Sequence, residues 1–140
     1  MKNLFRAVLI ALLLFPVLAQ AQSLQFGAPI LPYGSHVAAK STAVASSSLI
    51  VKAITGSLYS FTVTAGASAG YVMLFNSATV PADGTVTPIY CFPVAANSTF
   101  SQSYGGTPVA MNNGVVLVFS TTGCFTKTAS ATAFLAAQVN

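Results

Sequence analysis

The chain has 140 residues, with five Lys or Arg side chains and a single acidic one, Asp83. One carboxylate side chain excludes the paired carboxylates of glycoside hydrolysis, and a metal site would have to be built from Asp83, His36 and two cysteines. A Ser-His-Asp arrangement needs His36 and Asp83 together, but Asp83 lies in a Pro-Ala-Asp-Gly turn sequence that favours bonds to its own backbone. We therefore expect no catalytic residues, no metal site, no cofactor and no enzymatic activity.

The first 21 residues are typical of a signal peptide. Lys2 and Arg6 precede an apolar run from Ala7 to Leu18, and residues 19–21 read Ala-Gln-Ala, a small-x-small cleavage pattern. The run is shorter than the ~20 apolar residues that a membrane-spanning helix needs. We expect cleavage after Ala21, export to the periplasm or the extracellular space, and no membrane attachment of the mature chain.

The mature chain, residues 22–140, has the length of one domain. It carries three lysines and one aspartate, so its net charge is about +2, whereas Ser and Thr supply 29 of its residues. Three scattered lysines without an arginine make no nucleic-acid-binding surface. Because low charge favours self-association, we expect a homo-oligomer or a subunit held in an assembly.

Residues 22–47 are predicted to form an N-terminal arm. Glycines and prolines interrupt its apolar residues up to Gly34, which prevents a regular element of any length. Residues 38–48 are small and polar, and they fit either a weak edge strand or a linker. Two roles remain open for the arm: docking onto a partner, or folding over its own domain.

Residues 48–140 are predicted to form an all-β domain. Seven segments have strand character and are separated by turn signals: Leu49–Ile54, Leu58–Thr64, Gly70–Asn76, Pro88–Val94, Ser98–Tyr104, Val115–Phe119 and Ala131–Val139. Pro88 and Pro93 indicate an edge strand, since proline cannot donate to a ladder. Alanines leave the last segment ambiguous with a helix, although Ala133, Leu135 and Ala137 alternate as in a strand. About seven strands without a convincing helix predict an antiparallel β-sandwich or a jelly-roll-like barrel.

Three patterns refine this prediction. In Leu58–Thr64, Tyr59, Phe61 and Val63 alternate with hydroxyl residues, which predicts one buried face and one hydroxyl face. Asn113-Gly114 predicts a tight hairpin turn before Val115–Phe119. Gly70–Phe75 and Val115–Phe119 are apolar on both faces, and an isolated sandwich would expose one of these faces, so they also favour a homo-oligomer.

Aromatic side chains at strand spacing are interpreted as core residues: Tyr59, Phe61, Tyr71, Phe75, Tyr90, Phe92, Phe119 and Phe134. Tyr33 and Tyr104 lie next to glycines in loops, and we interpret them as candidate surface contacts. With the Gly105-Gly106 loop, they support an alternative function as an exported module that binds a carbohydrate or another small ligand.

The mature chain contains two cysteines, Cys91 and Cys124. Export delivers them to an oxidising compartment, which predicts a disulfide between the edge strand and the loop that joins the two last strands. The alternative is a pair of buried thiols that pack as small apolar side chains.

Two segments resemble a known family. The sequences GYVMLFNSATVPADGTVTP, from Gly70, and GVVLVFSTTGCFTKTASATAF, from Gly114, resemble small uncharacterised β-rich proteins encoded in phage and prophage genomes. The resemblance covers residues 49–139 and implies a structural or adhesive, virion-associated role with a virion or cell-surface partner. It transfers no catalytic or binding residue. The signal peptide departs from it, because most virion parts assemble in the cytoplasm.

Overall fold

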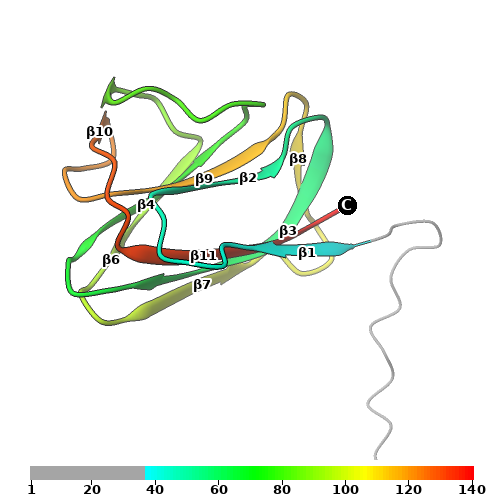
Figure 1. The fold of residues 1–140 in the computed structure, drawn as a ribbon. Coiled ribbons are helices and arrows are strands. Elements are labelled where there is room, and N and C mark those ends of the chain that lie inside the picture. Colours follow the sequence, from blue (N-terminus) through cyan, green and yellow to red (C-terminus); the bar gives the residue numbers. More distant parts are fainter. Residues whose placement is uncertain (1–36) are drawn as a thin grey trace, which may run out of the picture. The chain divides into compact units, whose positions relative to one another are not determined.

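The computed structural model describes residues 37–140, and within this range it contains eleven strands and no helix (Figure 1). Their bounds are β1 Ala38–Ser41, β2 Ser48–Lys52, β3 Gly56–Ala65, β4 Gly70–Phe75, β5 Gly84–Thr85, β6 Tyr90–Val94, β7 Thr99–Ser103, β8 Val109–Met111, β9 Val115–Ser120, β10 Thr126–Lys127 and β11 Ala133–Val139. The seven strands of five or more residues correspond to the seven predicted ones. The predicted signal peptide, Tyr33 and His36 lie outside the described residues.

Two antiparallel sheets pack face to face, which confirms the predicted all-β sandwich (Figure 1). The five-stranded sheet has the order β1-β11-β3-β7, with β8 also paired to β3, and the four-stranded sheet has the order β2-β9-β4-β6. Strand β6 is an edge strand, as Pro93 predicted. The short strands β5 and β10 pair with each other in a separate ribbon.

The core lies between the two sheets, and β9 is its most enclosed strand. All six residues of β9 are buried, because β2 and β4 flank it within the sheet. Val115, Leu117 and Phe119 face the core, whereas Val116 and Val118 belong to a second apolar cluster on the opposite face. The β-branched, two-sided pattern of this strand is therefore explained by cover on both of its faces.

Strand β3 has the predicted alternation, with one correction. Phe61 and Val63 are buried, but Leu58 rather than Tyr59 is the next core residue. The register with β11 shifts here, since Ser60 pairs with Gln138 while Leu58 pairs with Val139. This bulge inserts Tyr59 as an extra residue and turns Leu58 inward.

The predicted hairpin at Asn113-Gly114 is wrong. A tight turn is present, and Gly114 has a φ of 148°, but β8 pairs with β3 in one sheet while β9 lies in the other. The turn thus carries the chain between sheets. A Cβ at Gly114 would lie 2.5 Å from the carbonyl oxygen of Ser77 and 2.7 Å from that of Lys52, so the position requires glycine.

Part of the segment predicted as an arm belongs to the sandwich. Strand β1 pairs with β11 at the edge of the five-stranded sheet, so the edge-strand interpretation applies to Ala38–Ser41. All four β1 residues are exposed. The following loop stays attached to β11, because the N–H groups of Thr42 and Ser46 donate to the carbonyls of Leu135 and Ala133.

Candidate functional site

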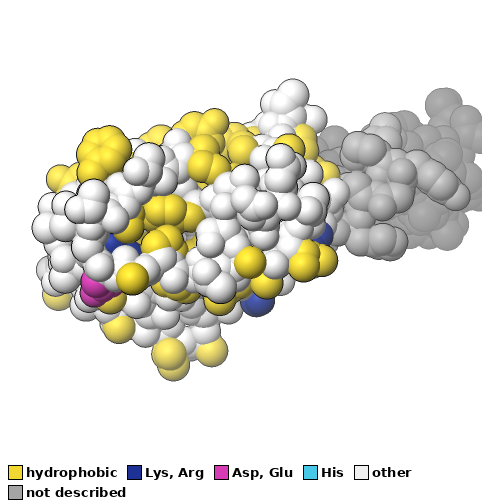
Figure 2. All heavy atoms as spheres, turned by 90° about the horizontal axis from the view of Figure 1, so that it is seen from above, with side chains coloured by type: hydrophobic (Ala, Val, Ile, Leu, Met, Phe, Trp, Pro, Cys, Tyr) yellow, Lys and Arg dark blue, Asp and Glu magenta, His cyan; other side chains and the backbone are white. Residues whose placement is uncertain are grey.

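The outer face of the four-stranded sheet is covered by the chain itself. The cover, here called the cap, consists of residues 76–89 and 121–132 and contains the β5–β10 ribbon. Met73, Phe75, Val116 and Val118 are buried on this face, and half-buried side chains of the cap and β6 pack against them: Val80, Val86 and Cys91. Figure 2 views the molecule from the cap side, where hydrophobic side chains gather among the loops and an acidic side chain lies beside a basic one.

The predicted disulfide fastens this cap. Cys91 on β6 and Cys124 in the cap are bonded, with their Cα atoms 5.6 Å apart, so neither is a thiol. The bond joins the edge strand to the loop after β9. It therefore closes the cap over the second apolar cluster.

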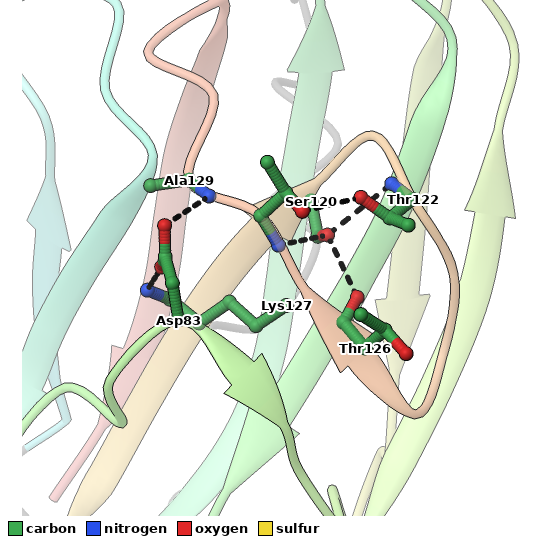
Figure 3. A network of polar contacts seen from close by, with 7 residues as sticks. Asp83, Ser120, Thr122, Thr126, Lys127 and Ala129 are labelled. Atoms are coloured by element: carbon green, nitrogen blue, oxygen red, sulfur yellow. Dashed lines mark hydrogen bonds and ion pairs between the residues drawn. The ribbon is translucent and has the colours of Figure 1, made fainter.

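Polar contacts hold the other end of the cap (Figure 3). The buried Ser120 hydroxyl donates to the carbonyl of Thr126 at 3.2 Å and accepts from the N–H groups of Thr128 at 2.9 Å and Thr122 at 3.4 Å. Lys127, which is 5% exposed, donates to Asp83. The hydrogen bond from Lys127 lowers the pKa of Asp83, and a second one from the N–H of Ala129 lowers it further. Asp83 thus links the two segments of the cap, residues 76–89 and residues 121–132.

The cap changes the interpretation of the strands that are apolar on both faces. Strands β4 and β9 carry a second apolar face because residues of the same chain cover it. These strands therefore do not themselves require a partner subunit.

Within residues 37–140, no other segment covers the outer face of the five-stranded sheet, and the outward residues of this face are uncharged. On β1, β11, β7 and the part of β3 that pairs with β7, the outward residues are small or hydroxyl-bearing with two larger ones, Phe134 and Gln138. These residues are Ala39, Ser41, Ser60, Thr62, Thr64, Thr99, Ser101, Ser103, Phe134, Ala136 and Gln138. Lys40 on β1 belongs to the opposite set, since it pairs with the inward Ala137. We call this surface the hydroxyl face.

Cross-strand hydrogen bonds order the hydroxyl face. Three pairs form across neighbouring strands: Thr62–Ser101 at 3.0 Å, Thr64–Thr99 at 2.9 Å, and Ser60 to Gln138 at 3.1 Å. A hydroxyl has one donor and two acceptor positions. In the Thr62–Ser101 and Thr64–Thr99 pairs one of the two O–H groups is used, so each of these pairs keeps one O–H group for another partner. The face therefore presents donors and acceptors in fixed rows.

Phe134 interrupts this polar face. Its side chain is 50% exposed, because inward Ala133 and Leu135 place Phe134 on the outer side of β11. The interpretation of Phe134 and Tyr90 as core residues is wrong, since Tyr90 is also 40% exposed. The alternation in Ala131–Val139 could have predicted this position. Ala133, Leu135 and Ala137 point to one face, so Phe134 between them must point to the other face.

Tyr104 lies at the end of a row of aromatic rings. The row closes the sandwich between the edge strands β6 and β7, where Phe92 contacts Phe100 with centroids 5.0 Å apart and Tyr90 contacts Tyr104 at 6.2 Å. The Tyr104 hydroxyl is buried without a hydrogen-bond partner among the described residues. Burial raises the pKa of Tyr104, and Tyr90 adds to the increase. The other candidate, Tyr33, lies outside the described residues.

Residues 37–140 contain neither a metal site nor a membrane-spanning helix. No group of three or more His, Cys, Asp or Glu side chains lies close enough there to hold a metal ion. No helix in the same range is long and apolar enough to cross a membrane.

Comparisons with known proteins find only a distant structural similarity. No protein-family model matches the chain, and no curated protein matches it in sequence. Among solved structures, the coat protein of Tobacco streak virus is similar at 11% identity, over 81% of this chain and 91% of that chain, with a TM-score of 0.42. Likeness at this level does not indicate a shared function, and the resemblance to phage-encoded proteins stays a prediction.

Proposed function

We propose that the protein is a non-enzymatic structural subunit that assembles with copies of itself through the hydroxyl face. One observation carries the proposal: within residues 37–140, a cross-linked cap covers the outer face of one sheet, and the outer face of the other sheet has no such cover. An assembly role is favoured over catalysis because Asp83, the acidic side chain among the described residues, forms an ion pair with Lys127. The disulfide supports an oxidising compartment, in agreement with the predicted export.

The hydroxyl face suits contact with its own copy. It has no charged residue, so two identical faces meet without repulsion between like charges. Hydroxyls both donate and accept, so a face built from them is complementary to itself. The internal pairs already order Thr62, Ser101, Thr64 and Thr99, so less side-chain entropy is lost when a partner binds.

The proposal is tested by measuring the oligomeric state of residues 22–140, using light scattering coupled to size-exclusion chromatography over a range of concentrations. Thr62→Arg places a charge in the middle row of the hydroxyl face and should shift the protein to monomers. Thr87→Arg, at an exposed cap position, is the control and should leave the assembly unchanged. A wild-type protein that stays monomeric at every concentration, or equal behaviour of the two variants, contradicts the proposal.

The phage resemblance suggests where such an assembly would function. A virion surface or a cell surface is the expected setting, and copies of the chain would form a layer on it. Immunoelectron microscopy of producing cells and released particles with an antibody against residues 37–140 distinguishes the two settings. Uniform periplasmic labelling without particles or surface layers contradicts both.

A second candidate function is the binding of a neutral ligand such as a carbohydrate beside Tyr104. The observation that favours it is the unpartnered hydroxyl of Tyr104 next to the half-exposed ring of Tyr90. A buried polar group without a partner is costly, and a ligand hydroxyl would satisfy it. A glycan array tests this candidate: signals that Tyr90→Ala abolishes support it, and an array without signals rejects it.

A further inference from the structure

We propose that two copies dock by their hydroxyl faces around a twofold axis, so that Phe134 of each copy fills a hollow over Ala136 of the other. The inference rests on the proposed function and specifies its contact. It uses a feature that the hydroxyl rows alone do not explain: one large exposed aromatic and one depression lie side by side on the same strand.

The protruding part is Phe134. Half of its surface is exposed, and its strand neighbours on the same face are small, with Thr64 paired to it on β3 and Thr99 next on β7. Val44, which is 70% exposed, lies in the loop whose residues Thr42 and Ser46 bond to β11 on either side of Phe134. An apolar knob therefore stands above an otherwise polar face.

The receiving part is a shallow hollow of about 330 Å³ over β1, β3 and β11. Its lining includes Ala39, Ser41, Thr62 and Ala136, together with Lys40 on the edge strand β1. The hollow exists because small side chains stand next to one another there: Ala136 pairs with Thr62 on one side and with Ser41 on the other. A ring that enters it meets mainly methyl groups and hydroxyls, and Lys40 is the charged residue of the lining.

The spacing of knob and hollow fits a twofold axis. Phe134 and Ala136 are two residues apart on β11 and point to the same side, with the inward Leu135 between them. An axis that lies between the two faces and crosses β11 at Leu135 runs the two β11 strands antiparallel. It then sets each Phe134 over Ala136 of the other copy, which is the reciprocal contact of an isologous interface.

The contact also explains why an exposed phenylalanine is placed on this face. Aromatic side chains that enter a pocket at the centre of an interface commonly supply most of its affinity, while surrounding polar contacts exclude water. The two Phe134 rings would be such anchors, and the hydroxyl rows would form the surroundings. Self-complementarity makes a second copy of this chain the occupant that fits.

Two single variants should each prevent docking. Phe134→Ala removes the knob, and Ala136→Phe fills the hollow and makes the new ring collide with Phe134 of the other copy. Each should weaken dimerisation at least about tenfold, as loss of an anchor aromatic does. Both positions face outward, so urea unfolding should show intact sandwiches. Phe125→Ala is the matched control: it removes a 67% exposed phenylalanine from the cap and should not change dimerisation.

The double variant Phe134→Ala with Ala136→Phe tests the reciprocal geometry. It exchanges knob and hollow on the same strand, so the same axis again places a ring over an alanine. We expect sedimentation velocity to show dimers restored relative to either single variant. Single variants that dissociate without rescue in the double variant overturn the twofold pairing.

Failure of this inference differs from failure of the proposed function. If Phe134→Ala keeps an assembly that Thr62→Arg disrupts, the Phe134 contact is wrong and assembly through the hydroxyl face stands. If the wild-type protein never associates, both the proposed function and this inference are wrong.

Discussion

Lys127 and Asp83 form an unequal ion pair: the side chain of Lys127 is 6% exposed, whereas that of Asp83 is 54% exposed. Lys127 lies on β10 inside the cap, and Asp83 precedes β5, the strand with which β10 pairs. Asp83 also accepts from the N–H of Ala129 at 3.1 Å. The buried cation therefore depends on a partner at the rim, and the cap depends on both.

Removal of Asp83 and removal of Lys127 should destabilise the protein by different amounts. Asp83→Ala leaves the ammonium of Lys127 buried without its partner, which is strongly unfavourable. Lys127→Met removes the charge and keeps an unbranched apolar chain in the same space, leaving Asp83 to water. We expect the urea midpoint to fall more for Asp83→Ala than for Lys127→Met. The reverse order would mean that Lys127 reaches water when Asp83 is absent.

Stability should decrease in acid because of Asp83. Its folded-state pKa lies below the ordinary value of 3.8, so the unfolded chain takes up this proton first as pH falls. The contribution of the pair is complete above the unfolded pKa and is lost as pH decreases from about 3.8 through the folded pKa. Thermal unfolding of wild type and Asp83→Asn at several pH values checks this: their difference in midpoint should shrink in acid. A constant difference contradicts the assignment.

The disulfide should be a major part of the stability of the fold. It closes a loop with a sequence separation of 33, which corresponds to about 3–4 kcal/mol in the chain-entropy model. The double variant Cys91→Ala with Cys124→Ala should lose that amount in urea unfolding. Wild-type protein unfolded in the presence of a reductant is the control and should show the same loss. Equal midpoints with and without reductant would show that the bond adds nothing.

Gly114→Ala should destabilise the crossing between the two sheets. The new Cβ would meet the carbonyl oxygens of Ser77 and Lys52, and alanine is strained at a φ of 148°. A backbone strain of this kind costs of the order of 1–3 kcal/mol. Gly105→Ala is the comparison, since its φ of 56° is also positive but no atom lies within 4 Å of the added Cβ. Chemical denaturation should rank Gly114→Ala as clearly worse.

Tyr104→Phe should stabilise the ligand-free protein by about 1 kcal/mol, because it removes a buried hydroxyl that has no partner in the described part of the chain. Tyr90→Phe, at a 40% exposed residue, should stay within about 0.5 kcal/mol of wild type. Ultraviolet titration gives a second readout: the raised pKa of Tyr104 predicts an ionisation above the ordinary tyrosine value of 10.0 that is lost in Tyr104→Phe. A loss of stability in Tyr104→Phe would indicate that the hydroxyl has a bonded partner.

Local patterns in the sequence were sufficient for the strands, the edge strand and the two-sided burial of β4 and β9. Alternation on β3 predicted a hydroxyl face because a strand sends successive side chains to opposite sides, whatever packs on them. The pairing of Cys91 with Cys124 was predicted from there being two cysteines in a chain that is expected to be exported. Such inferences need only residue type and spacing.

Tertiary structure alone decided what covers each face. Val116 and Val118 require burial, but the spacing of residues cannot show whether a partner subunit or a segment of the same chain buries them. In this structure the cap buries them. The turn at Gly114 had hairpin chemistry, yet strand pairing across β3 sent β8 and β9 to different sheets. Phe134 became a surface residue because Leu135 took the core position beside it. Burial and pairing are set by contacts distant in the chain, which local spacing does not encode.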